Sequence, residues 1–346
     1  MLKIGRKSVG LGQPCFIIAE AGINHNGNLK LAHRLIDAAK SAGADAVKFQ
    51  TFKAERLVAP GAPKADYQVK AGVKGSHYEM LRRLELSEKA HRDLRNYAKR
   101  KKIIFLSSPF DEESANFLER LHLPAFKIPS GEITNLPFLR HVARKKKPMI
   151  VSTGMSYLSE VRTAVRTIEA AGNKNLVLLH CVSQYPANPA EVNLKAMLTL
   201  KKIFGFPVGY SDHTLGIEIA IAAVAMGACV VEKHLTLDRT LRGPDHKASL
   251  EPTEFTTMVR GIRNVESAFG NGIKKPAKSE ANTAAVARKS LVATRDIAAG
   301  TKLKKEHLAV KRPGTGLPPA MLVRLVGRTT RKKISAGSLI RLEMIR

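Results

Sequence analysis

The chain alternates short apolar runs with longer segments in which apolar residues recur every three or four positions. Runs of four to six residues are typical of buried strands, and the longer segments are typical of amphipathic helices. Eight such units in one region favour an α/β fold of the (β/α)8 TIM-barrel type, in which helices cover a core of parallel strands. The predicted strands are 15–20, 45–50, 103–108, 125–129, 149–152, 176–181, 207–210 and 228–232.

Capping residues mark several of the predicted helices. We expect Asn28 to cap a helix of residues 29–42 that Gly43 ends, because Asn accepts from the first free N–H groups and glycine adopts the conformation that closes a helix. Ser159 is expected to cap a second helix, and residues 216–226 form a third. A doubly wound open sheet is the alternative, but no Gly-x-Gly-x-x-Gly follows the first strand to favour it.

The pattern changes after residue 270. Residues 271–284 are rich in Gly, Lys, Pro and Asn and predict a linker. We therefore expect a barrel domain over 1–270 and a small, mostly β domain over 285–346. The short β-like pieces of the second domain are 290–293, 308–311, 327–330 and 339–342.

Length and composition agree with this division. A chain of 346 residues with 44% hydrophobic residues can form one large core and a small one. No apolar run approaches the roughly 20 residues that span a bilayer, and residues 1–12 lack the apolar core of a signal peptide. Cys15, Cys181 and Cys229 lie in apolar runs without metal-ligand spacing. We expect a cytoplasmic protein with buried thiols and no membrane association.

The net charge of +29 raises the question of a polyanionic partner. Residues 285–346 hold fifteen Lys and Arg but only three Asp and Glu, a balance that nucleic-acid-binding proteins also have. However, aromatic residues make up only 5% of the chain, Trp is absent, and aromatic and basic residues do not interleave in the way that stacks bases. We expect a solvated basic surface. Nucleic-acid or ice binding through the basic C-terminal region is the alternative from another functional class.

Polar residues gather at the carboxyl end of every predicted strand. In a (β/α)8 barrel these ends share one face, which holds the active site. We therefore interpret the recurrence as an active site and not as scattered structural residues. The principal residues are Glu20, Lys48, Gln50, Ser108, Lys127, Ser130, Glu132, Ser152, Ser183, Tyr185, Ser211, His213, Glu232 and His234.

Lys48 and Lys127 are costly to bury in a barrel mouth unless an anion compensates their charge. Together with serine hydroxyls, they provide charge and short donors for a small substrate that carries phosphate and carboxylate groups. The alternative is that each lysine forms a structural ion pair with Glu20 or Glu132. The serines expected beside the lysines are Ser130, Ser152 and Ser211.

His213 and His234 follow neighbouring predicted strands. Both rings could therefore bind one divalent ion, with water and substrate completing its coordination. Either histidine alone is explained as a hydrogen-bonded core residue, but the paired placement favours a metal site. Asp212, Glu232 and Asp245 are the acceptors available to orient the two rings.

Nine motifs, in order along the chain, resemble the sialic acid synthase family, which condenses phosphoenolpyruvate with an N-acetylated amino sugar. The first reads Ile-Ala-Glu-Ala-Gly-Ile-Asn-His-Asn-Gly over 18–27. The C-terminal region is similar to the family's SAF domain, which is itself similar to fish type III antifreeze proteins, with Lys-Arg-Pro-Gly at 311–314. The other motifs are 46–51, 105–111, 126–132, 152–155, 180–186, 209–214, 232–236 and 243–252.

The resemblance implies N-acetylneuraminate synthase activity, in which phosphoenolpyruvate, open-chain N-acetylmannosamine and water give N-acetylneuraminate and phosphate by C–O cleavage. Glu20 is the residue expected to manage the proton, with Glu132 as the alternative, and His213 and His234 are implied to bind Mn²⁺, with Mg²⁺ and Co²⁺ as alternatives. The residues implied to bind phosphoenolpyruvate are Lys48, Lys127, Ser130, Ser152, Ser183 and Ser211. Those implied to bind the sugar are Glu20, Gln50, Ser108, Tyr185, Asp245 and Arg312 of the partner subunit.

The resemblance also implies a homodimer in which the SAF domain of one subunit covers the barrel of the other. Within the same fold, the alternative reactions are those of synthases for legionaminic acid, pseudaminic acid or a 3-deoxy sugar acid, and phosphorylation of the sugar at C6 stays open. Ser108, Ser183 and Leu235 stand where Thr, Asn and Phe occur in other members. These differences affect the sugar preference more than the reaction.

Overall fold

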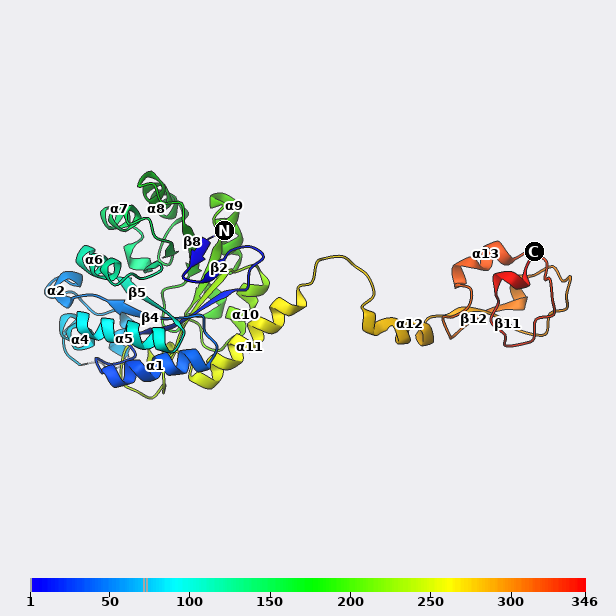
Figure 1. Ribbon diagram of the computed structural model, residues 1–346, viewed down its shortest axis with the longest axis horizontal. Coiled ribbons are helices and arrows are strands. Elements are labelled where there is room, and N and C mark those ends of the chain that lie inside the picture. The colour runs from blue at the N-terminus through cyan, green and yellow to red at the C-terminus, as the bar shows by residue number, and fades with distance from the viewer. Residues whose placement is uncertain (1, 71, 73) are drawn as a thin grey trace. The chain divides into compact units, whose positions relative to one another are not determined.

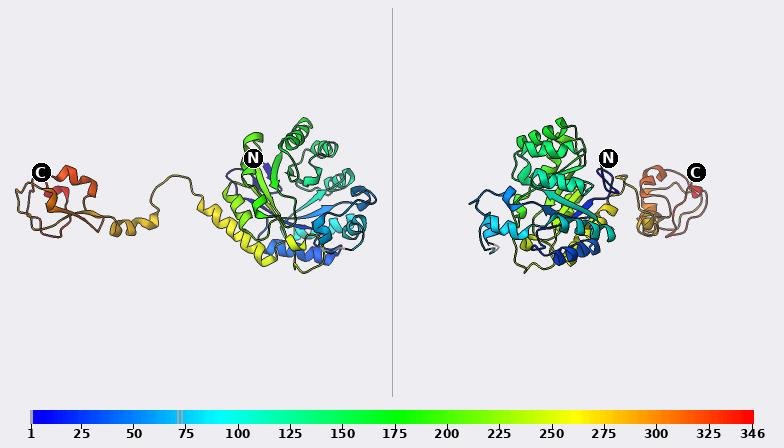
Figure 2. Two further views of the ribbon diagram at one scale, coloured as in Figure 1. Left: turned by 180° about the vertical axis from the view of Figure 1, so that it is seen from behind. Right: turned by 60° about the vertical axis from the view of Figure 1, so that its left-hand side comes forward.

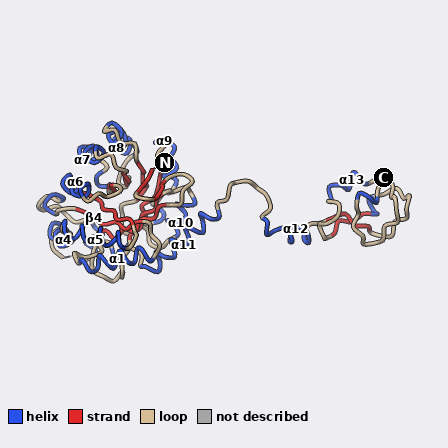
Figure 3. The backbone as a smooth tube through the Cα atoms, in the orientation of Figure 1, coloured by secondary structure: helices blue, strands red, loops and turns tan. Residues whose placement is uncertain are grey.

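Eight parallel strands form a curved sheet inside a ring of helices in this computed structural model, which describes residues 2–70, 72 and 74–346 (Figures 1 and 3). Their hydrogen-bonded order is β5-β4-β3-β10-β9-β8-β7-β6, and the two end strands of this order lie next to each other. The sheet is therefore a near-closed barrel. The strands are β3 Phe16–Gly22, β4 Ala46–Thr51, β5 Ile104–Pro109, β6 Phe126–Ile128, β7 Met149–Ser152, β8 Leu176–Cys181, β9 Val208–Asp212 and β10 Val230–His234.

All eight predicted strands are present, so the barrel prediction is confirmed. The first barrel strand, β3, pairs with the last one, β10, and this pairing excludes the doubly wound open sheet. Both β9 and β10 run two residues beyond their predicted carboxyl ends. The reason is that the ladders continue there, with Lys233 opposite Asp212 and His234 opposite Glu20.

Amphipathic helices cover the outside of the barrel (Figure 2). In α1, the Asn28 side chain accepts hydrogen bonds from the amides of Lys30 and Leu31, as predicted. The buried face of α1 includes Leu35 and Ile36, which pack against the strands. The helices are α1 Leu29–Ser41, α5 Glu88–Arg100, α6 Glu112–Arg120, α7 Leu136–Arg144, α8 Leu158–Ala170, α9 Lys195–Phe204, α10 Glu218–Ala225 and α11 Pro252–Ala268.

The predicted cap of α8 is wrong. The helix begins at Leu158, so Ser159 lies inside its first turn. Instead, the Glu160 carboxylate accepts a hydrogen bond of 2.7 Å from the Tyr157 amide and satisfies a free N–H group at this end. A glutamate three residues into the segment therefore positions the helix start more strongly than the serine does.

A short antiparallel hairpin, β1 Leu2–Ile4 and β2 Lys7–Val9, precedes the barrel. Its buried side chains Leu2, Ile4 and Val9 belong to the same apolar cluster as barrel residues such as Phe16 and Ile18. This cluster fills the barrel interior towards the amino ends of the strands. Lys48, Lys127 and Glu232, which are buried, lie beyond this cluster towards the carboxyl ends of the strands.

The connection between β4 and β5 is much longer than one helix requires. Residues 52–87, here called the β4–β5 insertion, contain α2 Ala54–Leu57, α3 Asp66–Lys70 and α4 His77–Leu84 before α5 begins. Ser76 and Glu79 form a capping box at the start of α4. The insertion has an apolar cluster of its own with the residue Ile23 that follows β3.

The chain divides into two compact units, Met1–Phe269 and Gly270–Arg346. The second unit has its own apolar core, which includes Leu291, Ile334 and Ile340. The predicted pieces 327–330 and 339–342 form only isolated bridges, and α12 includes the end of the predicted linker. The elements of this unit are α12 Ala281–Ala287, α13 Leu322–Leu325 and the antiparallel pair β11 Ser290–Ala293 and β12 Leu308–Lys311.

No helix in the described part of the chain is long and apolar enough to cross a membrane. The three cysteines are buried and free, as predicted.

Candidate active site

A cavity of about 480 Å³ lies at the carboxyl ends of the strands. It brings together all but two of the predicted site residues. Those that line it are Glu20, Lys48, Gln50, Ser108, Lys127, Ser130, Ser152, Ser183, Tyr185, Ser211, His213, His234 and Asp245.

The two-residue period of a strand decides which side chains reach the cavity. On β10, Glu232 and His234 line the cavity, whereas Lys233 between them does not. The Lys233 ammonium is fully buried elsewhere, 2.7 Å from Asp212 Oδ2 and 2.6 Å from the Thr214 carbonyl oxygen. The Lys233–Asp212 pair is thus structural, and the alternate residues are free for chemistry.

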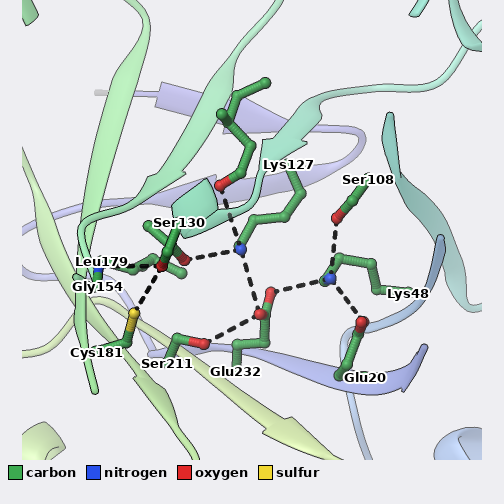
Figure 4. Close-up of polar contacts among 12 residues, drawn as sticks. Glu20, Lys48, Ser108, Lys127, Ser130, Gly154, Leu179, Cys181, Ser211 and Glu232 are labelled. Carbon is green, nitrogen blue, oxygen red and sulfur yellow. Dashed lines mark hydrogen bonds and ion pairs between the residues drawn. The ribbon is translucent and has the colours of Figure 1, made fainter. Parts of the chain in front are cut away.

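Two lysines and two glutamates form a buried ion network on the cavity floor (Figure 4). Lys48 Nζ lies 2.7 Å from Glu20 Oε2 and 3.7 Å from Glu232 Oε2. Lys127 Nζ lies 3.3 Å from Glu232 Oε1. The carboxylate of Glu232 therefore stands between the two ammonium groups. The predicted alternative of an ion pair between Lys48 and Glu20 is therefore present. Among the described residues, Glu132 forms no ion pair with Lys48 or Lys127.

The pKa values of this network favour a positive floor. Burial raises the pKa of Glu20 to about 7, against the opposing attraction of Lys48. Burial also raises the pKa of Glu232, but Lys127 and Lys48 outweigh it, and the net shift is downward. Burial lowers the pKa of Lys127, whereas the pKa of Lys48 is raised because its two carboxylate neighbours outweigh its burial. When Glu20 holds a proton, two ammonium groups face one carboxylate, and the floor attracts anions.

Three serine hydroxyls line the cavity near Lys127, and one of them, that of Ser152, contacts its ammonium group (Figure 4). Lys127 Nζ donates to Ser152 Oγ at 2.8 Å, and Ser211 Oγ donates to Glu232 Oε1 at 3.1 Å. Ser130 Oγ accepts from the Gly154 amide at 3.0 Å. A side chain on Gly154 would collide with the side chains of Ser130, Ser183 and Cys181, so only glycine allows this cluster to converge.

His213 and His234 lie beside each other, with ring centroids 5.5 Å apart. His213 Nδ1 donates to the Val182 carbonyl oxygen at 2.7 Å, which leaves the lone pair of Nε2 available. Burial lowers the pKa of His213 to about 4 and that of His234 well below its usual value. Both rings are therefore neutral at pH 7, the form that binds metals.

The residues present fit a divalent ion with an open coordination shell. In the described residues, no group of three or more His, Cys, Asp and Glu side chains is arranged to hold a metal. His213 and His234 would therefore supply two ligands, and water and substrate the others. Asp245 Oδ2 lies 3.9 Å from His234 Nδ1, and burial raises the pKa of Asp245 to about 7. At this distance Asp245 makes no hydrogen bond to His234, whose Nδ1 is buried without a hydrogen-bond partner among the described contacts.

Tyr185 connects the histidines with the β4–β5 insertion. Its ring lies 4.2 Å from that of His213 and 5.5 Å from that of His234, measured between centroids. On its other side, the ring of Tyr67 on α3 lies 4.9 Å away. Four rings therefore line one continuous side of the cavity.

Two predicted site residues lie elsewhere. Glu132 is next to Ser130 and Gly131 but does not line the cavity, and its Oε2 accepts from Asn135 Nδ2 at 2.7 Å. Arg312 belongs to the second unit, where it is exposed and its Nε donates to the Ala287 carbonyl oxygen at 3.1 Å. Its predicted role at the partner's barrel stays a prediction.

Sequence reasoning missed two contributions to the site. Glu232 was expected only to orient a histidine, yet it joins Lys48 and Lys127. The insertion supplies several lining residues, among them Tyr67 and Gln68, that no motif indicated. The signal that could have found them is the length of the segment between two predicted strands, because a βα connection of that size normally carries function.

Known proteins resemble this chain over both units. A model of the NeuB family matches residues 35–274, and a model of the SAF domain matches 288–346. The N,N'-diacetyllegionaminic acid synthase of Legionella pneumophila is 51% identical over 99% of this chain and 97% of its own length. The protein of the same name from Campylobacter jejuni is 49% identical over 94% of this chain and 98% of its own length.

A solved structure agrees with these matches. The N-acetylneuraminic acid (sialic acid) synthetase from Leptospira borgpetersenii, in complex with citrate, is 37% identical, with a TM-score of 0.73, and the match covers 82% of this chain and 94% of that chain. The predicted resemblance and the predicted SAF domain are thereby confirmed. The chain is an enzyme of the ulosonic acid synthases and belongs to the NeuB family.

Proposed function

We propose that the enzyme condenses phosphoenolpyruvate with a hexose that carries two acetamido groups, and so forms an N,N'-diacetyllegionaminic acid and phosphate. The observation that carries the reaction class is the pair of buried ammonium groups, Lys48 and Lys127, which share Glu232 beside two neutral histidines. The two relatives named as diacetyllegionaminic acid synthases support the choice of sugar. A product with two acetyl groups requires a sugar with two acetamido groups, since phosphoenolpyruvate brings no nitrogen.

Phosphoenolpyruvate binds at the Lys127 end of the floor in this account. Its phosphate and carboxylate groups accept hydrogen bonds from the ammonium groups and from the hydroxyls of Ser130, Ser152 and Ser183. Because the floor is positive when Glu20 is protonated, the anion enters without leaving buried charge uncompensated. The serine cluster around Gly154 fixes the orientation of the phosphate.

The reaction then joins C3 of phosphoenolpyruvate to the aldehyde carbon of the open-chain sugar. Water adds at C2, and phosphate leaves as the C2–O bond breaks, so that the carboxylate product retains the oxygen of water. Glu20 lies beside Lys48 and takes or returns the proton of the water or hydroxyl group. A divalent ion bound by His213 and His234 would supply Lewis-acid polarisation of the aldehyde oxygen.

N-acetylmannosamine is the second candidate sugar. It was the sugar that the motifs favoured, and the solved sialic acid synthetase supports it at a lower identity of 37%. The higher identities of 51% and 49% to the diacetyllegionaminic acid synthases favour the diacetamido sugar instead. The structure of this diacetamido hexose follows from that of N,N'-diacetyllegionaminic acid when the three carbons that come from phosphoenolpyruvate are removed.

Phosphate release by the purified protein tests this proposal. We expect release from phosphoenolpyruvate with the diacetamido hexose, and kcat/KM lower by about tenfold or more with N-acetylmannosamine, since one missing contact group in a pocket discriminates by about 10- to 200-fold. EDTA should stop the reaction and added Mn²⁺ should restore it. A higher kcat/KM with N-acetylmannosamine would identify that sugar as the substrate in place of the diacetamido hexose. Activity that survives EDTA would refute the role of the metal.

A further inference from the structure

The lining of the cavity contains two chemically different groups of residues. One group is the lysines, the serines and the histidines, which we call the polar end. The other is a set of apolar side chains from one cluster, Leu57, Val58 and Leu81 from the β4–β5 insertion together with Ile23 and Phe110. We call these five residues the apolar wall. The proposed reaction uses only the polar end.

The apolar wall is fixed in place by the packing of the insertion. Its members belong to one apolar cluster, in which α2 and α4 contact each other. Glu85 holds the start of α2, because its Oε1 accepts from the Ala54 amide at 2.8 Å and its Oε2 lies 2.8 Å from Lys53 Nζ. The wall is therefore a built surface and not a chance exposure of apolar residues.

The position of the wall relative to the reacting groups follows from Tyr67 and Tyr185. Tyr67 belongs to the insertion, and its ring packs on Tyr185, which packs in turn on His213. The β4–β5 insertion therefore contacts the rings beside the histidines and also supplies part of the apolar wall. The far end of the sugar is the end away from its aldehyde, which carries the substituents that distinguish the amino sugars.

The charges of the cavity do not favour a phosphate at this end. Among the described residues that line the cavity, the lysines are Lys48 and Lys127, and both are bound to carboxylates on the floor. His77 also lines the cavity, but its Nδ1–H is donated to the Pro63 carbonyl oxygen at 3.0 Å. A phosphate dianion next to apolar side chains would lose its hydration without gaining a cation.

Building on the proposed function, we propose that the apolar wall is the specificity element for the acceptor sugar. It binds methyl groups at the far end of the sugar, such as that of the second acetamido group, and excludes sugars phosphorylated at that end. The insertion thus chooses the sugar, while the polar end performs the same reaction on each.

Val58 offers the sharpest test, because it is half-buried and its backbone is extended, so threonine fits without strain. For wild type and Val58→Thr, kcat/KM is measured with the diacetamido hexose, N-acetylmannosamine and N-acetylmannosamine 6-phosphate. We expect wild type to prefer them in that order, and Val58→Thr to lower the preference for the diacetamido hexose over N-acetylmannosamine by about tenfold, the lower limit of what hydrophobic pockets discriminate. Val58→Lys should raise relative activity with the 6-phosphate by tenfold or more.

Val69 provides the matched control. It lies on α3 in the same insertion, is 58% exposed and does not line the cavity, so Val69→Thr and Val69→Lys should leave all three ratios unchanged. Wild-type preference for the 6-phosphate, or Val58 variants that change all sugars equally, would overturn the inference while the proposed reaction stands. A folded protein that releases no phosphate with any of the three sugars would overturn both the inference and the proposed reaction.

Discussion

Replacing Lys127 with methionine should lower kcat/KM for phosphoenolpyruvate by about 10²- to 10³-fold, mainly through a higher KM. Methionine keeps the length of the side chain but removes the ammonium group that lies between Ser152 Oγ and Glu232 Oε1. A lost hydrogen bond to a charged group costs about 1.5–3 kcal/mol. The remaining negative charge of Glu232 then repels the anionic substrate, which adds to the loss.

The control for this variant is Lys174→Met. Lys174 is exposed and precedes β8, so its replacement removes one positive charge without touching the cavity. We expect its kinetic constants to stay within twofold of wild type. Because Lys127→Met also leaves a buried carboxylate with one partner fewer, thermal unfolding should be measured beside the kinetics. A folded Lys127→Met protein with an unchanged KM would refute the assignment of the phosphoenolpyruvate site.

Replacing Glu20 with glutamine should lower kcat by about 10²- to 10⁴-fold, the usual contribution of a general acid or base. Glutamine keeps the shape of the side chain beside Lys48 and Gln50 but cannot exchange the proton. Binding of phosphoenolpyruvate, measured by calorimetry without the sugar, should remain. Burial raises the pKa of Glu20 to about 7, so the carboxyl gains its proton as the pH falls through neutrality. Because the ionised form is the expected base, wild-type kcat should fall as the pH falls.

Glu132→Gln distinguishes the two candidates for this role. Glu132 is the other carboxylate that the sequence offered, but it does not line the cavity and is hydrogen-bonded to Asn135. We expect kcat of this variant within twofold of wild type. A severe loss in Glu132→Gln combined with a mild one in Glu20→Gln would reverse the assignment.

The barrel and most of the site were predictable because strand periodicity is a local property. Short apolar runs mark the buried strands, and polar residues in or just after the carboxyl-terminal half of each run mark its functional end, which placed His234, Lys48 and Ser152 correctly in one cavity. Prediction failed where contacts join distant residues. The start of α8 depended on Glu160, and the role of Glu232 depended on two lysines from other strands.

The sugar end of the cavity could not be predicted for a related reason. The apolar residues of the β4–β5 insertion look like ordinary helix core residues in the sequence, because Leu81 stands with Met80 and Leu84 at the three- and four-residue spacing of a buried helical face. Only the fold shows that the same residues also border the cavity. The proposed determinant of sugar choice thus follows from tertiary placement, whereas the reaction class can be inferred from local motifs.

The most direct test of the central claim uses phosphoenolpyruvate with ¹⁸O in the oxygen that joins C2 to phosphorus. The labelled compound is incubated with the diacetamido hexose, Mn²⁺ and the enzyme, and both products are examined by mass spectrometry. We expect a new acid three carbons longer than the sugar, without label, and phosphate that carries the ¹⁸O. Label in the sugar acid, or no acid at all from a folded enzyme, would contradict it.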